Sequence, residues 1–145
     1  MSPIKIDVIT AEQQVMSDDV DVVVAPGIIG ELGILPHHAP LITMLQPGEL
    51  IIRKGHDETY MVVTGGFLEV RPDKIIVLAD ACERAEEIDI ERAEAAKLRA
   101  EERLKTHPAG VDEMRAEAAL RRSLIRLRIA ERRSRKGTGK PSFQV

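Results

Sequence analysis

The sequence predicts an antiparallel β-sandwich or barrel of about ten short strands, followed by two helices that form an antiparallel hairpin. Up to residue 79, apolar residues occur in short alternating or continuous runs that glycine and proline interrupt, as is typical of strands. After residue 93, Ala, Glu, Arg and Leu dominate, and the apolar period becomes helical. The charge changes at the same place, because residues 1–84 hold 6 Lys or Arg against 13 Asp or Glu, whereas residues 85–145 hold 15 against 11.

The composition is that of a small globular protein. A chain of 145 residues has room for one ordinary domain, or for a compact domain with an appendage. Its hydrophobic fraction of 43% argues against wholesale disorder. The only aromatic residues are Tyr60, Phe67 and Phe143, so the core has to be built from Val, Ile and Leu. A net charge of −3 argues against a dedicated nucleic-acid binder.

Cysteine usage and the N-terminal residues indicate the compartment. The single Cys82 cannot form an internal disulfide, which fits a reducing environment. Asp7 and Glu12 interrupt any apolar core that a signal peptide would need, and no run approaches the roughly 18 apolar residues that span a bilayer. We therefore expect a soluble, cytosolic chain without direct membrane insertion, which can still reach a membrane complex through a partner.

The strands follow from apolar runs between turn signals. Residues 4–10 alternate and are expected to pair with residues 13–17 across a tight turn, and residues 20–25 form a continuous apolar run that Pro26-Gly27 ends. Glycine and proline punctuate residues 28–40 every few positions, which is typical of a bulged or corner-turning segment. The remaining predicted strands span residues 41–45, 49–54, 59–63, 67–71 and 74–79, with residues 55–58 linking the second and third of them.

The two helices are separated by a short link. The first is expected to open at Ile88 or Asp89, because several glutamates around this point suit the positive end of a helix dipole. Residues 106–110 break it, and Asp112 is expected to cap the second helix. A short link between two amphipathic helices predicts an antiparallel hairpin.

The two helices are expected to pack through faces of different width. The narrow face of the first consists of Ala93, Ala96, Ala100 and Leu104. The apolar stripe of the second is expected to comprise Met114, Ala118, Leu120, Leu124, Ile125, Leu127 and Ile129. Small alanines allow a close approach of the helices, so we expect their packing energy to be modest and their docking reversible.

The histidines and the cysteine lack the spacing that is typical of a catalytic or metal site. The histidines at positions 37, 38, 56 and 107 lack metal-ligand spacing, Cys82 has no signature around it, and His38 is interpreted as a turn or core-edge histidine. Gly137 to Lys140 resembles half a P-loop, but Ser134 stands where the first glycine belongs and Pro141 replaces the Ser or Thr. We therefore predict no catalytic residue and no metal site.

Two pairs of arginines each share a helical face. Arg92 and Arg99 are seven residues apart, and Arg122 and Arg126 are four apart on the other helix. If the hairpin closes, the four guanidinium groups can converge on one polyanion, because they bind phosphate oxygens in bidentate fashion. In the alternative, the arginines form a solvated basic face that pairs with Glu94, Glu101, Glu102 and Glu117. Spacing alone favours this alternative.

The second helix offers another surface, because residues 121–136 are strongly basic. Such a helix can dock on an acidic partner surface or on nucleic acid. Nucleic acid is the weaker of the two, since no aromatic residue is interleaved. Basic residues near a helix C-terminus also stabilise the helix itself.

Four segments form a recognisable set. They read GELGILPHHAP from Gly30, TGGFLEV from Thr64, VLAD from Val77 and ERAEEID from Glu83. This set resembles the epsilon subunit of bacterial F-type ATP synthase, a non-catalytic part of that complex. The match runs in order from about residue 4 to about residue 135, and the tail from residue 137 lies outside it.

The resemblance implies a domain organisation and partners. Residues 1–84 would form a ten-stranded antiparallel β-sandwich that contacts the gamma subunit and the c-ring, and residues 85–136 a regulatory two-helix hairpin, followed by a flexible tail at 137–145. The hairpin would extend along gamma and place its basic second helix against the alpha and beta catalytic subunits, which restrains ATP hydrolysis. The chain would then be a peripheral part of the proton-translocating complex at the cytoplasmic face of the cell membrane.

The resemblance also implies a nucleotide site. In some family members the folded hairpin binds ATP through an I/L-D-x-x-R-A motif, which residues 88–93 match in full. The predicted ATP-binding residues are Glu83, Ile88, Asp89, Arg92, Ala93, Arg99, Arg122 and Arg126. ATP would act as a regulatory ligand and not as a cofactor, because a ligand that binds only the closed hairpin shifts the equilibrium toward it.

Three functions remain in order of preference. The first is a non-catalytic rotor subunit whose hairpin senses ATP, and its alternative is a purely structural stalk adaptor without physiological ATP binding. In that alternative the arginines serve salt bridges and the partner interface. A binder of nucleic acid or of an anionic surface, using the second helix, comes third.

Overall fold

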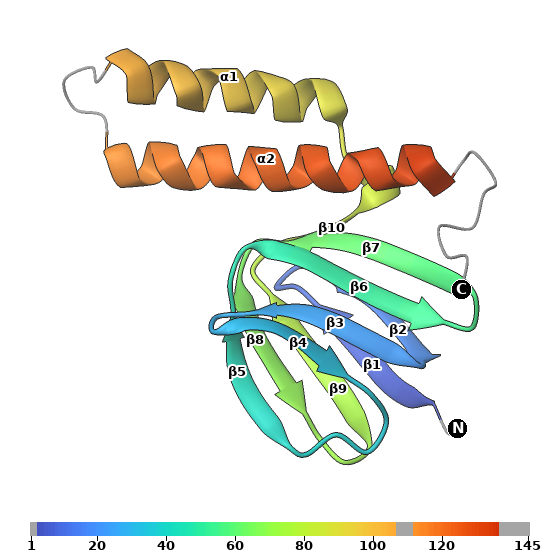
Figure 1. Cartoon of the computed structure of the whole chain (residues 1–145). Helices are drawn as coiled ribbons and strands as arrows, with labels where there is room; N and C mark the ends of the chain where they lie inside the picture. Colours follow the sequence, from blue (N-terminus) through green and yellow to red (C-terminus); the bar gives the residue numbers. More distant parts are fainter. Residues whose placement is uncertain (1–2, 107–111, 137–145) are drawn as a thin grey trace. The chain divides into compact units, whose positions relative to one another are not determined.

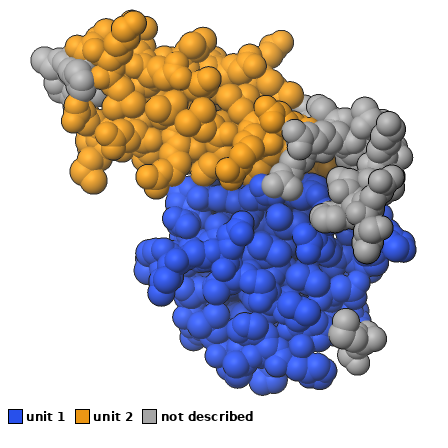
Figure 2. Space-filling model, viewed as in Figure 1, with its two compact units in different colours: residues 1–84 blue, residues 85–145 orange. Residues whose placement is uncertain are grey.

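The chain divides into two compact units, Met1–Arg84 and Ala85–Val145 (Figure 2). The computed structural model describes residues 3–106 and 112–136, and side chains as far as residue 131. Strands make up the first unit and helices the second (Figure 1). The predicted fold class, a β-sandwich followed by two C-terminal helices, is confirmed.

The first unit holds ten strands among its described residues. They are β1 (Ile4–Ile9), β2 (Gln14–Val20), β3 (Val22–Gly27), β4 (Gly30–Ile34), β5 (Leu41–Leu45), β6 (Gly48–Lys54), β7 (Asp57–Val63), β8 (Gly66–Val70), β9 (Lys74–Ala79) and β10 (Cys82–Arg84). Their order in the sheet is β10-β7-β6-β3-β5-β8-β9-β1-β2, with β4 paired to β3 beside this path. Neighbouring strands are antiparallel except β1 and β9, which are parallel. The sheet thus curls into a sandwich with a closed interior (Figure 1).

The interior of the sandwich is aliphatic. Strand residues that alternate in sequence point inward, as in β1, where Ile4, Ile6 and Val8 are buried while Lys5 is exposed. The largest fully buried side chains include Ile34, Leu50, Ile52, Met61, Leu68 and Ile75. No aromatic residue belongs to the core cluster of the described residues, as the composition predicted. Burial of each such Val, Leu or Ile side chain contributes roughly 1.5–3 kcal/mol of hydrophobic free energy, so this interior stabilises the sandwich.

Two glycines explain the TGGFLEV segment. Gly65 and Gly66 have φ angles of 126° and 122°, a region that side-chain-bearing residues rarely adopt. A Cβ on Gly66 would lie 2.0 Å from the carbonyl oxygen of Leu78 and 2.9 Å from the Cα of Ala79. The close approach of β8 to β9 therefore requires glycine at position 66.

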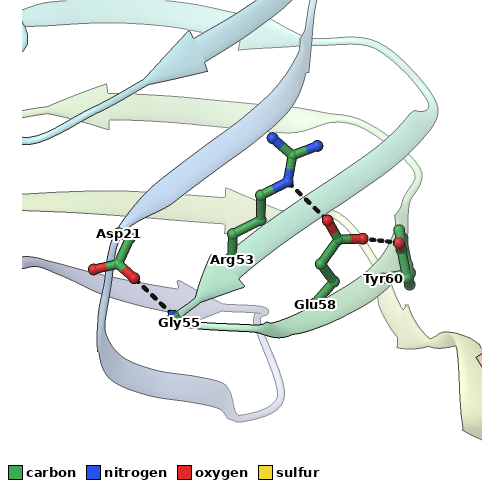
Figure 3. A network of polar contacts seen from close by, with 5 residues as sticks. All are labelled: Asp21, Arg53, Gly55, Glu58 and Tyr60. Carbon is green, nitrogen blue, oxygen red and sulfur yellow. Dashed lines mark hydrogen bonds and ion pairs between the residues drawn. The ribbon is translucent and has the colours of Figure 1, made fainter. Parts of the chain in front are cut away.

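The β6–β7 hairpin is tied together by side chains (Figure 3). Arg53 faces Glu58 across the ladder, and its Nε donates to Glu58 Oε1 at 3.0 Å. The Tyr60 hydroxyl donates to the other oxygen of the same carboxylate. The Gly55 amide donates to Asp21 Oδ2 at 2.7 Å, which fastens the turn to the start of β3. Because β7 begins at Asp57, the turn is shorter than the predicted link over residues 55–58.

Two parts of the sandwich differ from the sequence expectation in detail. Within residues 28–40, only Gly30–Ile34 forms a strand, β4, which folds back on β3. Strand β10 was not predicted, because its three residues carry no apolar alternation and are all half-buried. It forms through backbone pairing with β7 at the edge of the sheet.

The second unit consists of the short 3-10 turn η1 (Ala85–Glu87) and two helices, α1 (Ile90–Thr106) and α2 (Glu113–Lys136). The helices lie side by side and run in opposite directions (Figure 1), as the predicted hairpin requires. Asp112 caps α2, since its Oδ1 accepts hydrogen bonds from the backbone amides of Met114 and Arg115 at 2.9 and 3.4 Å. Of the predicted helix break over residues 106–110, residues 107–110 lie outside the described residues, as does the tail at 137–145.

The buried face of the hairpin is built from small residues. On α1, Ala93 and Ala100 are buried and Ala96 and Leu104 half-buried, as predicted. On α2, the predicted stripe was partly wrong, because Met114 is 79% exposed, Leu124 is 45% exposed and Ala118 is exposed. Up to residue 131, the buried residues of α2 are Ala116, Ser123, Ile129 and Ala130.

Helical periodicity explains this correction. Positions 116, 123 and 130 are seven residues apart and therefore lie on one face, which the larger residues at 114 and 124 do not share. Ser123 was not predicted to be buried because it is polar. Its hydroxyl donates to the Ala119 carbonyl at 2.9 Å, so it is buried with its hydrogen bond made.

Candidate functional site

The Ile88–Ala93 motif forms the start of α1. Asp89 is the N-cap, because its Oδ1 accepts a hydrogen bond from the Arg92 amide at 3.1 Å and its carbonyl accepts one from the Ala93 amide at 3.0 Å. Ile88 is only 3% exposed and anchors the chain just before the helix. Ala93 is buried at the helix–helix contact, where a small side chain suits close packing. Three motif positions therefore have a structural task, and Arg92 is left on the surface.

The four predicted arginines are distributed over both helices. Arg92 and Arg99 are exposed on α1, whereas Arg122 and Arg126 are half-buried on α2. Among the described residues, the guanidinium groups of Arg92, Arg99 and Arg122 make no hydrogen bond or ion pair, while Arg126 does interact within the protein. Three guanidinium groups without a carboxylate partner among the described residues are what a site for a multiply charged anion would need.

The alternative, in which glutamates neutralise these arginines, differs from the observed contacts. Within the described part of the chain, Glu94, Glu102 and Glu117 form no ion pair, and Glu101 faces Lys97 at 3.8 Å. The helix spacing that suggested such pairs places the charges near one another, but the side chains remain apart in solvent. Among the described residues, the guanidinium groups of Arg92, Arg99 and Arg122 therefore have no carboxylate partner.

Glu83 belongs to the first unit. It lies on β10, half-buried and paired in register with Val62 of β7. The other seven predicted residues all lie in the second unit.

Sequence reasoning missed two arginines of the same hairpin. Arg103 of α1 and Arg115 of α2 line a groove of about 550 Å³ together with the predicted Arg122. Their spacing gave the signal, because Arg103 follows Arg99 by four residues and Arg115 precedes Arg122 by seven. Neither belongs to the ATP motif, so the resemblance did not include them.

A row of exposed apolar side chains was also missed. Met44, Phe67 and Leu78 face each other in register on the adjacent strands β5, β8 and β9, and each is about half exposed. Ile42, two residues from Met44, is 71% exposed on the same face. Such a contiguous row on a protein surface is typical of a protein–protein contact. The sequence showed only the alternation of these strands, not which strands would be neighbours.

The remaining reactive side chains in the described part of the chain do not gather into a further site. Among the described residues, no three His, Cys, Asp or Glu side chains are grouped as a metal site would require. Cys82 is half-buried with its Sγ 3.5 Å from the sulfur of Met61. None of the described helices combines the length and apolar character that crossing a membrane demands.

Comparison with protein families gives two adjacent matches. Residues 3–85 match the beta-sandwich domain of the ATP synthase delta/epsilon chain, and residues 86–131 match its long alpha-helix domain. The ATP synthase epsilon chain of Dehalococcoides mccartyi is 57% identical over 134 residues, which cover 92% of this chain and 96% of the relative. That of Desulforamulus reducens is 50% identical over 127 residues, covering 88% and 96%.

Solved structures with the same fold come from larger assemblies. A chain of the mitochondrial ATP synthase of Euglena gracilis, in a structure of its OSCP/F1/c-ring part, superimposes with a TM-score of 0.68 at 20% identity, covering 94% of this chain and 82% of that one. A chain from the central stalk and c-ring of the Tetrahymena thermophila enzyme gives a TM-score of 0.53 at 15% identity, covering 91% and 96%. At these identities the likeness concerns the fold. Taken with the two family matches and the close relatives, the chain belongs to the delta/epsilon family of ATP synthase subunits.

Proposed function

We propose that the chain is a non-catalytic central-stalk subunit of a proton-translocating ATP synthase, which couples rotation and restrains ATP hydrolysis through its hairpin. ATP binds the closed hairpin as a regulatory ligand and favours that state. The observation that carries the regulatory part is that Arg92, Arg99 and Arg122 have no hydrogen-bond or ion-pair partner for their guanidinium groups among the described residues. The other identified members of the motif build the start of α1. The family membership supports the stalk role.

The energetics of the hairpin suit a ligand-controlled element. Its buried side chains are mostly Ala and Ser, which contribute little hydrophobic free energy. A ligand at a hundred times its Kd stabilises the state that it binds by about 2.7 kcal/mol. A shift of this size is large relative to a modest helix–helix packing energy, so ATP concentration sets the fraction of closed hairpins.

The stalk contacts are assigned to separate surfaces. The exposed row of Met44, Phe67 and Leu78 docks on the gamma subunit, because burying it removes apolar surface from water. The sandwich also meets the c-ring, which holds the chain peripherally at the cytoplasmic face of the membrane. The basic part of α2, when released, lies against acidic elements of the alpha and beta subunits.

The first test is calorimetric titration of ATP, ADP and GTP into the full chain. Selective binding of ATP near or below millimolar concentration is expected. Arg92→Ala and Arg126→Ala should abolish it without unfolding the sandwich, because each removes a phosphate contact and no core volume. Arg128→Ala, an exposed arginine of α2 outside the site, is the matched control and should bind as wild type does. Full affinity in Arg92→Ala or Arg126→Ala would disprove the assigned site.

The second test concerns regulation in the reconstituted complex. Truncation after Ala85 removes the hairpin and should relieve the restraint on ATP hydrolysis while the sandwich still docks. Unchanged hydrolysis after truncation would contradict the regulatory role. A complete absence of ATP binding together with normal docking would favour the structural adaptor, in which the arginines serve the partner interface.

A further inference from the structure

Ile129 is the one large aliphatic side chain that is fully buried in the described part of the two helices. Its exposed fraction is 0%, and the other buried residues of α1 and α2 up to residue 131 are alanines and Ser123. A buried isoleucine contributes far more hydrophobic free energy than a buried alanine or serine. The segment that covers Ile129 is therefore important for how α2 is held.

Helical spacing turns Ile129 away from the small-residue face of α2. Ala116, Ser123 and Ala130 recur every seven residues and form that face. Successive side chains on a helix are about 100° apart, so Ile129 points about 100° away from its neighbour Ala130. The face that packs through alanines is thus not the face that carries Ile129.

The segment just before α1 is a second neighbour of α2. The 3-10 turn η1 contacts α2, and its yellow-green ribbon lies beside that helix (Figure 1). Ala85 and Ile88 are both buried in this segment, and the Ile88 amide donates to the Ala85 carbonyl at 3.4 Å. In an antiparallel hairpin with equal rise along both helices, Ile90 at the start of α1 is level with about residue 129 of α2. Ile88 and Ile129 are therefore buried at the same end of the hairpin.

We propose that Ile129 is a positioning residue for the Ile88–Ala93 motif, because its side chain packs on Ile88 and holds the start of α1 while α2 is packed. Asp89 follows Ile88 directly and caps α1 through the Arg92 amide. A displacement of Ile88 therefore disturbs the cap and moves Arg92. The contact is a property of the ligand-free chain, whereas its effect on nucleotide binding rests on the proposed function.

This contact makes the motif depend on the position of α2. When α2 leaves α1, Ile88 loses the side chain that covers it, and the first turn of α1 is no longer fixed from that side. A nucleotide then meets an ordered motif only in the closed hairpin. Such a difference in affinity between two states is what a ligand needs in order to shift their equilibrium.

The first test is hydrogen exchange of the full chain without ATP, in Ile88→Ala, Ile129→Ala and the double variant. Ile129→Ala should speed the exchange of the amides of residues 88–93 by roughly tenfold to a hundredfold, as expected for a large-to-small substitution at a buried site. Ile88→Ala should do the same for the amides around residue 129. The double variant should exchange only a few-fold faster than the faster single variant, because both substitutions remove one contact. Ile129→Val should retain most of the protection.

The matched control is Leu98→Ala combined with Leu124→Ala, one position on each helix. These leucines are 64% and 45% exposed, so their truncation should change exchange little. Effects of the two isoleucine substitutions that multiply in the double variant would show that the side chains act separately and would overturn the contact. Wild-type exchange of residues 88–93 in Ile129→Ala would overturn it too. If the alanine variants open the whole hairpin, Ile88→Val and Ile129→Val provide the same cycle in smaller steps.

Calorimetric titration of ATP separates this proposal from the nucleotide site. Ile129→Ala should raise the Kd of ATP by roughly tenfold, and Ile129→Val by much less, although Ile129 is not among the predicted ATP-binding residues. Wild-type affinity in Ile129→Ala would overturn the positioning role. Failure of ATP to bind the wild-type chain would overturn the nucleotide site, while the exchange cycle would still decide whether Ile129 positions the motif.

Discussion

The sandwich and the hairpin bury very different side chains. The sandwich closes around Ile6, Ile52, Leu68 and other large aliphatic residues. In the two helices up to residue 131, one large aliphatic residue, Ile129, is buried, and the other buried residues are the small Ala93, Ala100, Ala116, Ser123 and Ala130. Burial of a large aliphatic side chain stabilises by roughly 1.5–3 kcal/mol, while alanine offers far less apolar area. We therefore expect the sandwich to be the more stable unit and the packing of the two helices to be weaker. A ligand that binds the packed helices can shift the equilibrium of a weakly packed hairpin.

The largest effect on stability is expected from a substitution inside the sandwich. Gly66→Ala should destabilise the sandwich by about 3 kcal/mol or more, because it combines a positive φ with a Cβ 2.0 Å from the Leu78 carbonyl oxygen. Gly33→Ala is the matched control, since a Cβ there meets nothing within 4 Å. Urea unfolding followed by far-ultraviolet circular dichroism measures both. Equal free energies of unfolding for the two variants would show that β8 and β9 can move apart at position 66, so that the sandwich is not rigid there.

A smaller effect is expected at the helix–helix contact. Ala100→Leu should cost about 1–3 kcal/mol of hairpin packing, because Ala100 is 3% exposed and a larger side chain forces the helices apart. Ala95→Leu, at an exposed position of the same helix, should be close to neutral. Hydrogen exchange of α1 and α2 amides reports the difference, and exchange in the sandwich core should stay unchanged. Slower hairpin exchange in Ala100→Leu would mean that the packing has room for a larger residue.

The smallest effect is expected at the start of α1. Asp89→Ala removes the N-cap and should reduce hairpin stability by about 1 kcal/mol. Asp89→Asn keeps a capping oxygen and should retain most of the wild-type stability of the hairpin. Helicity in the absence of ATP, measured by circular dichroism, distinguishes a cap from a residue that only contacts ligand. If Asp89→Ala left helicity unchanged, the conformation of the motif would not depend on Asp89.

The sequence predicted the architecture because its signals are periodic. Alternation in residues 4–10 and the alanines of α1 each specify one buried face, and the structure agrees with both. The stripe of α2 was partly missed because hydrophobicity favoured Met114 and Leu124, whereas close helix packing selects small residues at positions 116, 123 and 130. Strand β10 was missed because backbone pairing with β7, and no side-chain pattern, creates it.

The candidate site was predictable only in part, for a similar reason. Spacing placed Arg92 with Arg99 and Arg122 with Arg126. It could not show that Arg92, Arg99 and Arg122 make no ion pair with the glutamates of the described residues. Nor could it show that Arg103 and Arg115 line one groove, since that depends on how the two helices pack. The apolar row of Met44, Phe67 and Leu78 likewise depends on which strands become neighbours.

The proposed function requires that ATP stabilises the closed hairpin and does not change the stability of the sandwich. The most direct measurement is hydrogen exchange of the full chain with and without saturating ATP, resolved by segment. The proposed function predicts that amides of α1 and α2 exchange more slowly with ATP, while those of β1, β6 and β8 keep their rates. Unchanged exchange in both helices, at an ATP concentration that saturates the calorimetric titration, would contradict it.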